Sequence, residues 1–307
     1  MIRWKFCLYV ISLGLFSYCS ADSELKTEEA NTTIGAQNTA PAEQEQLNVT
    51  VLLDLSDRVE PSKYPASPEH ADRDIEIVKY LTHLFKDEME DKGAYMAKGK
   101  MKVIFSPRPE DSEINEIASR LNVDLSKQPN AQAKKKVFDS IEETFNENLR
   151  DIYSKVIETK KYPGSDVWRF FKNDVKDYAI DRDSNYRNVL VVLTDGYLFH
   201  TDSRNVEGNR TAHLTPQSLQ ARGLRGNNWR ANFDDRDFGY ITSRNDLENL
   251  EILVLEVNPT PGHKSDEDVI KAYLSKWFDE MGVNKYKIYN SDLPEYTKSR
   301  IDDFFQS

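Results

Sequence analysis

The sequence contains little cysteine and histidine, and both shortages limit the chemistry that the chain can carry. Its two cysteines, Cys7 and Cys19, both lie near the start of the chain, so the rest holds no disulfide framework and no cysteine-ligated zinc or iron–sulfur site. The five histidines are scattered without metal-ligand spacing. Phosphate-binding loop, dinucleotide-binding, nucleophile-elbow and HExxH patterns are also missing. The sequence therefore contains none of these motifs that would indicate an enzyme.

Basic residues are also fewer than acidic residues. The chain has 41 lysines and arginines against 52 acidic residues, which gives a net charge of −11, so we do not expect a general nucleic-acid binder. Aromatic residues are plentiful, with 14 Phe, 15 Tyr and 4 Trp, too many for a wholly disordered chain. A length of 307 residues suits one large domain or two small ones with a sizeable core.

The first twenty residues have the composition of an export signal. Arg3 and Lys5 precede an apolar run over residues 6–16, which is too short to span a bilayer comfortably. The run leads to Cys19, and this arrangement resembles a lipoprotein signal, although Tyr18 stands where a small residue is usual. The resemblance implies a signal peptide over residues 1–18 and a lipid anchor on the Cys19 thiol. An ordinary secretory signal is the alternative.

Residues 19–46 form a polar stretch rich in Glu, Thr, Asn, Ala and Gln, which cannot bury enough apolar surface to order itself and is typical of a linker. It is similar to the linker of Bacteroidetes-type surface lipoproteins. The resemblance implies an outer-membrane lipoprotein, periplasmic or surface-exposed, and the alternative is a secreted protein. Loss of residues 1–18, which carry two basic and no acidic residues, would change the net charge to −13.

Residues 47–307 alternate strand-like and helical patterns. Continuous apolar runs predict strands that are buried on both faces, and apolar residues at helical spacing predict amphipathic helices. The expected strands cover residues 48–55, 102–105, 188–194, 250–257 and 285–289, and the expected helices cover 72–92, 132–159, 166–179, 265–282 and 295–305. This alternation predicts an α/β domain with a doubly wound, mostly parallel central sheet and helices on both faces.

A long connection over residues 197–249 separates two of the expected core strands, where connections are normally short. It contains seven arginines and leaves the strand that ends before Asp195. One interpretation is a lid or recognition surface, with Trp229 or Phe233 as an anchor. The other is a decoration that only packs against the domain.

Polar residues follow the two most apolar strands. Asp54 and Ser56 come directly after the first, and the Thr194-Asp195-Gly196 triplet follows the other. Ser165 lies in a loop that opens a predicted helix. Function in parallel sheets is found at the carboxyl ends of the central strands, so these residues are the candidate site.

Asp54-Leu55-Ser56, the Ser165 loop and the Thr194-Asp195-Gly196 triplet resemble the metal-ion-dependent adhesion site of von Willebrand factor type A (VWA) domains. The resemblance extends over residues 47–305 in element order. It implies a Rossmann-like VWA fold, a Mg²⁺ or Mn²⁺ ion held by Asp54, Ser56, Ser165 and Asp195, and a protein partner bound through that ion. Carboxylate and hydroxyl oxygens are the ligands that Mg²⁺ prefers.

One residue departs from the family pattern. Arg58 stands where the motif has its third residue, a serine, and a guanidinium cannot ligate a cation. Either Asp57 or a water takes that place, or Arg58 replaces the ion by pairing with the carboxylates, which would leave a metal-free scaffold. A phosphate-ester hydrolase that uses Asp54 is the lesser hypothesis, because the motif for such a nucleophile has a second aspartate where this chain has Ser56.

Overall fold

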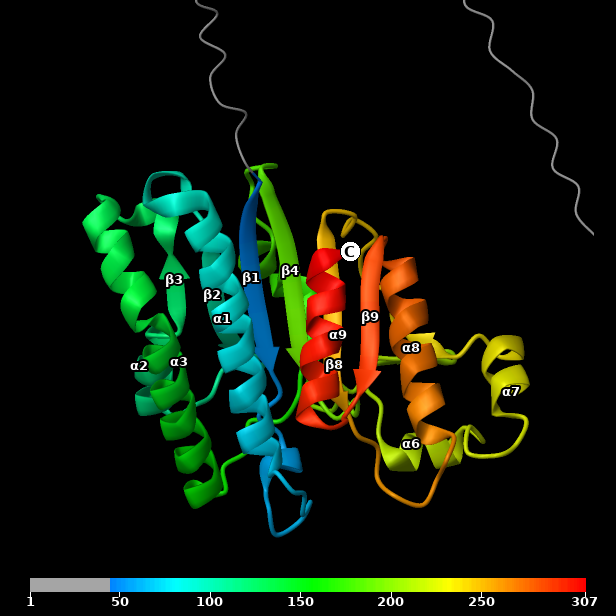
Figure 1. Ribbon diagram of the computed structural model, residues 1–307. Coiled ribbons are helices and arrows are strands. Elements are labelled where there is room, and N and C mark those ends of the chain that lie inside the picture. Colours follow the sequence, from blue (N-terminus) through cyan, green and yellow to red (C-terminus); the bar gives the residue numbers. More distant parts are fainter. Residues whose placement is uncertain (1–44) are drawn as a thin grey trace, which may run out of the picture. The chain divides into compact units, whose positions relative to one another are not determined.

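A computed structural model describes residues 45–307 (Figure 1). The predicted signal peptide, Cys19 and all but the end of the predicted linker lie outside the described residues. The first strand begins at Gln46, one residue before the expected start of the domain. No helix of residues 45–307 is long and apolar enough to cross a membrane.

Six strands form a mostly parallel central sheet. In spatial order they are β3 (Asn122–Asp124), β2 (Lys100–Phe105), β1 (Gln46–Leu53), β4 (Tyr186–Leu193), β8 (Leu250–Val257) and β9 (Lys285–Asn290). Only β3 is antiparallel to its neighbour. The arrows of β1, β4 and β9 in Figure 1 therefore point to one edge of the sheet. Chain segments that follow these strands emerge together at that edge.

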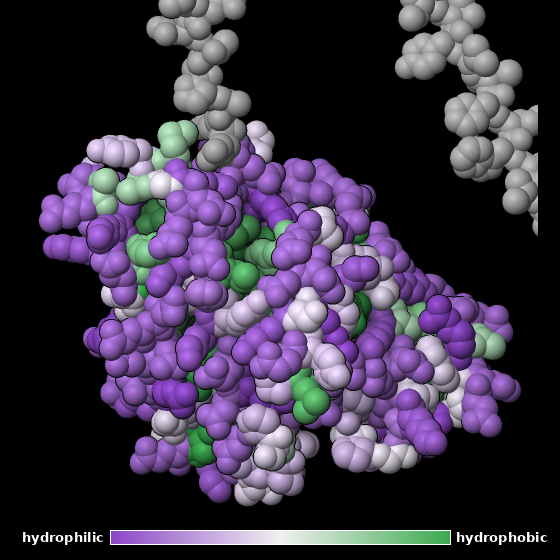
Figure 2. All heavy atoms as spheres, viewed as in Figure 1, coloured by the Kyte–Doolittle hydropathy of each residue, from purple (hydrophilic) through white to green (hydrophobic). Residues whose placement is uncertain are grey.

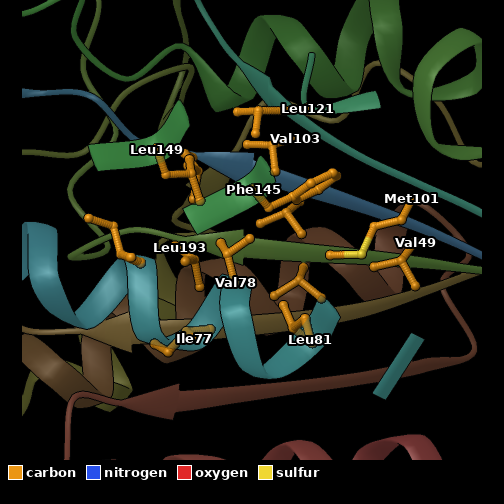
Figure 3. Packing of buried hydrophobic residues seen from close by; sticks show 14 of the residues in the cluster. Val49, Ile77, Val78, Leu81, Met101, Val103, Leu121, Phe145, Leu149 and Leu193 are labelled. Atoms are coloured by element: carbon orange, nitrogen blue, oxygen red, sulfur yellow. The ribbon is translucent and has the colours of Figure 1, made fainter. Parts of the chain in front are cut away.

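Helices cover the sheet because successive strand residues point to opposite faces. Along β4, Val189, Val191 and Leu193 join one hydrophobic cluster, whereas Leu190 and Val192 join another. The first cluster also takes residues of α1 (His70–Met96), α2 (Ser112–Ser119), α3 (Ala131–Thr159) and α9 (Pro294–Gln306). Figure 3 shows α1 residues such as Val78 and Leu81 packed with Val49, Met101 and Phe145. The second cluster takes α4 (Val167–Arg169), the π-helical turn Phe170–Asp174, α5 (Val175–Ala179) and α8 (Asp266–Glu280).

The long connection between β4 and β8 has its own secondary structure. It contains β5 (Val206–Glu207), β6 (Arg210–Thr211), α6 (Pro216–Ala221), α7 (Trp229–Asp235) and β7 (Gly239–Tyr240), and the three strands form a small second sheet. Phe233 and Tyr240 pack edge-on against Tyr273 of α8. The connection is thus a folded insertion that shares the second hydrophobic cluster.

A buried carboxylate ties this insertion to α8. Asp266, fully buried at the start of α8, accepts hydrogen bonds from Arg225 Nε at 3.0 Å and Arg225 Nη2 at 2.5 Å. The Tyr197 hydroxyl also donates to Asp266, over 2.9 Å. Asp266 therefore joins the insertion to the chain segment that leaves Asp195.

All of the expected strands and helices are present, with shifted ends. Helix α2, strand β3 and the small sheet were not expected, because they are too short to show a period. The expected helix over residues 166–179 contains the π-helical turn at Phe170–Asp174. The prediction of a mixed α/β domain with a mostly parallel sheet flanked by helices is confirmed.

Replacing Asp266 tests how the insertion is held. We expect Asp266→Ala to lower the free energy of unfolding by roughly 1–3 kcal/mol, because Arg225 and Tyr197 lose their buried acceptor. Limited proteolysis should then cut within residues 197–249 before it cuts the sheet. The control is Glu267→Ala, which removes only the partly exposed pair with Lys271 on the same helix. Equal protease resistance of the two variants would contradict the assignment.

Candidate functional site

Asp54 joins the carboxyl ends of the two central strands. It follows β1 directly, and its amide donates to the carbonyl of Leu193 over 3.1 Å. Its Oδ2 accepts from the Thr194 hydroxyl and its Oδ1 from the Ser56 amide, each over 2.8 Å. Asp54 is only 2% exposed. Both of its oxygens are thus held in place, and each retains lone-pair capacity for a further contact.

Asp195 follows β4 at the same edge. Its backbone carbonyl accepts from the Asn258 amide at 3.0 Å and its Oδ1 from the Tyr197 amide at 2.9 Å. Burial and the charge of Asp54 raise the pKa of Asp195 to about 7, although Tyr197 and the Arg58 guanidinium oppose the shift. No ion pair between residues 45–307 neutralises Asp195, so its ionised form is electrostatically costly.

Gly196 makes the turn that presents Asp195. Its φ of +94° is a conformation that other residues rarely adopt, and a Cβ there would lie 2.6 Å from Cγ2 of Ile270. The glycine of the sequence triplet is therefore required both by the backbone and by packing against α8.

Ser165 reaches this edge from a distant part of the chain. An isolated bridge pairs Gly164 with Leu55, and the Ser165 amide donates to the Phe199 carbonyl over 3.2 Å. The Ser165 hydroxyl is buried and makes no hydrogen bond to the described part of the chain. A buried polar group without a partner is uncommon in folded proteins and calls for an explanation.

These residues surround a cavity with a volume of about 790 Å³. Ser56, Ser165 and Asp195 line it, as do Asp57 and Arg58. Asp54 and Thr194 are buried and are not among the lining residues, and the hydrogen bond between them connects the strand ends. The insertion contributes Thr215, Pro216 and Gln217 at the start of α6. The insertion therefore both packs against α8 and forms part of the cavity wall.

The oxygen atoms at this edge suit a hard divalent cation. They comprise two carboxylates, the unpartnered Ser165 hydroxyl and the Ser56 hydroxyl, which makes no hydrogen bond within residues 45–307. Such ligands, completed by water, are those of Mg²⁺ and Mn²⁺. Among the described residues, no cluster of three or more His, Cys, Asp or Glu could hold a metal ion. A cation here would therefore depend on serine hydroxyls as well as on Asp54 and Asp195.

Arg58 is directed to another carboxylate. Its Nη2 forms a buried ion pair with Asp74 of α1, and its Nε donates to the backbone carbonyl of Asp54 over 3.1 Å. The Tyr153 hydroxyl of α3 donates to the same Asp74 oxygen over 2.6 Å. The described ion pairs do not join Arg58 to the Asp54 or Asp195 side chains. Its charge is thus compensated by a carboxylate of α1.

Two further residues support the site and were not expected. Asp74 is hidden in an ordinary helical pattern, and nothing in the sequence indicates its pairing with Arg58. Asp166 caps the helix that follows Ser165, and its carboxylate accepts a hydrogen bond from the Ser203 hydroxyl at 2.8 Å and forms an ion pair with Arg169 Nε at 3.1 Å. An aspartate at a helix start is a recognisable sequence signal, so Asp166 could have been found.

Comparisons with known proteins find matches among solved structures alone. No family model matches the chain, and no curated protein matches it. Two crystal structures of the pilus adhesin SpaC from Lactobacillus rhamnosus GG, one in an open conformation, align with TM-scores of 0.40 and 0.38 and with 9% and 10% identity. Each alignment covers 85% of this chain and 30% of the adhesin chain, so the chain spans under a third of that protein.

Removing Arg58 tests the buried ion pair. We expect Arg58→Met to lower the free energy of unfolding by about 3–5 kcal/mol at pH 8, because the Asp74 carboxylate stays buried without its counter-charge. Burial already raises the pKa of Asp74, and loss of Arg58 would raise it further. Protonation relieves the penalty, so the loss should be smaller at pH 5 than at pH 8.

Urea denaturation at both pH values measures this difference. Arg150→Met is the control, because Arg150 of α3 pairs with Asp72, two residues before Asp74 on α1, but both side chains are about half exposed. That variant should lose less than about 1 kcal/mol. A loss for Arg58→Met that is equally small, or independent of pH, would refute a buried ion pair.

Proposed function

We propose that the chain carries a VWA-like domain that binds a protein partner through a divalent cation, Mg²⁺ or Mn²⁺, held by Asp54, Ser56, Ser165 and Asp195. The strand order supports a doubly wound, Rossmann-like arrangement, since the chain runs outward from β1 to β2 and β3 and then returns to β4, β8 and β9. The proposed site lies between β1 and β4, where this order reverses, which is where such sheets bind ligands.

The single observation that carries the proposal is the Ser165 hydroxyl. It is buried without a hydrogen-bond partner among residues 45–307, at the cavity that Asp195 also lines. An unsatisfied buried hydroxyl costs about 1–3 kcal/mol, and a cation that accepts its lone pair would remove that cost. The same cation would offset the repulsion between Asp54 and Asp195, so one ligand accounts for both features.

A bound cation would supply a coordination position for a carboxylate from a partner. The serine ligands add no charge, so two carboxylates would balance a divalent ion while its free positions still attract an anionic group. Asp57 and Thr194 act as supporting residues, Thr194 by orienting Asp54. Arg58 pairs with Asp74 and not with the side chains of Asp54 or Asp195 among the described ion pairs, which favours this function over a metal-free scaffold.

The alternatives lack a comparable observation. A metal-free scaffold leaves the Ser165 hydroxyl unexplained. A phosphate-ester hydrolase would need Asp54 as an accessible nucleophile, but Asp54 is only 2% exposed and does not line the cavity that a phosphate ester would enter. As to location, we propose an outer-membrane lipoprotein anchored through Cys19, periplasmic or surface-exposed, on the strength of the N-terminal sequence alone.

Thermal unfolding with and without Mg²⁺ tests the cation. A ligand at a hundredfold excess over its Kd stabilises the native state by about 2.7 kcal/mol, which raises Tm by several degrees. We expect this rise for the unaltered chain with Mg²⁺ or Mn²⁺. Ser165→Ala should abolish the rise and leave the Tm in EDTA unchanged, because the deleted hydroxyl has no partner to lose.

The matched control is Thr297→Ala on α9. Its hydroxyl is also buried and unpartnered, but it does not line the cavity. Thr297→Ala should therefore keep the full Mg²⁺-induced rise. No rise in the unaltered chain, or the same rise in Ser165→Ala, would reject the cation site.

A further inference from the structure

The mouth of the cavity carries two exposed lysines. Lys63 and Lys160 both line it. Lys63 donates to Asp57 Oδ2 over 2.8 Å, an exposed contact. Lys160, which ends α3 in a left-handed conformation with φ of +53°, makes no hydrogen bond or ion pair to any residue of 45–307. Its ammonium group is free to bind an incoming anion.

Glu60 interacts with Lys160 through its charge, but the Glu60 side chain is buried. Glu60 is 5% exposed and accepts from the hydroxyls of Ser62, over 2.6 Å, and Tyr162. These two hydrogen bonds lower the pKa of Glu60 to about 2, and the charge of Lys160 lowers it less. Since the Glu60 carboxylate is satisfied by hydroxyls, it leaves the Lys160 ammonium group without a contact partner.

The walls of the cavity suit a short extended segment of protein. They contain four aromatic rings, from Tyr64, Tyr162, Tyr197 and Phe199, together with four prolines. A volume of about 790 Å³ lies within the range of pockets that enclose a ligand rather than a flat protein face. Stiff ring and proline walls lose little conformational freedom when they bind, which favours a loop or peptide that enters the cavity. The face shown in Figure 2 is mostly hydrophilic, with only scattered hydrophobic groups.

We propose that the cavity binds a short, extended segment of a partner protein that carries two carboxylates, one for the cation at Asp195 and Ser165 and a second for Lys160. The proposal rests on the proposed function, because without the cation the first carboxylate would be repelled by Asp54 and Asp195. Lys160 is then a specificity-determining residue. Because the chain has a net charge of −11, an acidic segment is repelled on average, so local positive charge such as that of Lys160 is needed to bind it.

Fluorescence anisotropy of labelled peptides tests the second carboxylate. Three probes differ only in charge: Gly-Asp-Pro-Gly-Glu-Tyr-Gly, the same peptide with Gln for Glu, and the same with Asn and Gln for both acids. With the full chain and saturating Mg²⁺, we expect the two-acid peptide to bind about fivefold more tightly than the one-acid peptide, the upper end for one exposed ion pair. EDTA should abolish the binding of both.

Lys160→Gln should remove the fivefold preference while its Tm rise with Mg²⁺ stays intact. Lys161→Gln is the matched control, since Lys161 is exposed but does not line the cavity, and it should keep the preference. Equal affinity for the two acidic peptides, equal behaviour of the two variants, or no peptide binding despite an intact Mg²⁺ effect would overturn this inference alone.

Two other outcomes of these experiments would lead to different conclusions. Absence of any Mg²⁺-induced Tm rise would reject the proposed function itself. Tighter binding of a probe with phosphoserine in place of Glu, unaffected by Lys160→Gln, would overturn the two-carboxylate segment in favour of a phosphate ligand.

Discussion

The parallel pairing of β1 with β4 is the constraint on which the rest of this structure depends. The register runs unbroken from Gln46 opposite Tyr186 to Leu53 opposite Leu193, so both strands end at the same level. Asp54 therefore emerges level with Thr194, which donates a hydrogen bond to it, and Asp195 follows one residue later at the same edge. Two carboxylates at the ends of buried strands repel each other, so it costs free energy to hold them at one edge. The surrounding loops contribute groups that interact with them.

Three kinds of group surround the two carboxylates. Backbone amides donate to both carboxylates. Arg58 supplies positive charge, but it is engaged with Asp74 and Tyr153 and so links the site to α1 and α3. The loop that carries Ser165 adds a hydroxyl with no protein partner. The proposal that a cation binds here rests on this combination, and so does the preference for a binding function over a scaffold in which Arg58 replaces the ion.

The insertion between β4 and β8 gives the site its particular shape. It is fastened to α8 by Arg225 and Asp266, and Tyr197 joins the same carboxylate from the segment after Asp195. The start of α6 then lies along the cavity. The same segment packs on the domain and lines the cavity, and its role as a lid or recognition surface stays a prediction.

The sequence by itself determined the main strands and helices and the candidate site residues. Long apolar runs and helical periods reflect local burial, and the aspartates of a parallel sheet must follow its strands. The tertiary structure alone decided the partner of Arg58, the isolation of the Ser165 hydroxyl and the exposure of Lys160 at the cavity. Arg58 and Asp74 are 16 positions apart, and Gly164 pairs with Leu55 across more than a hundred residues. Such contacts depend on packing between distant segments, and no local pattern records them.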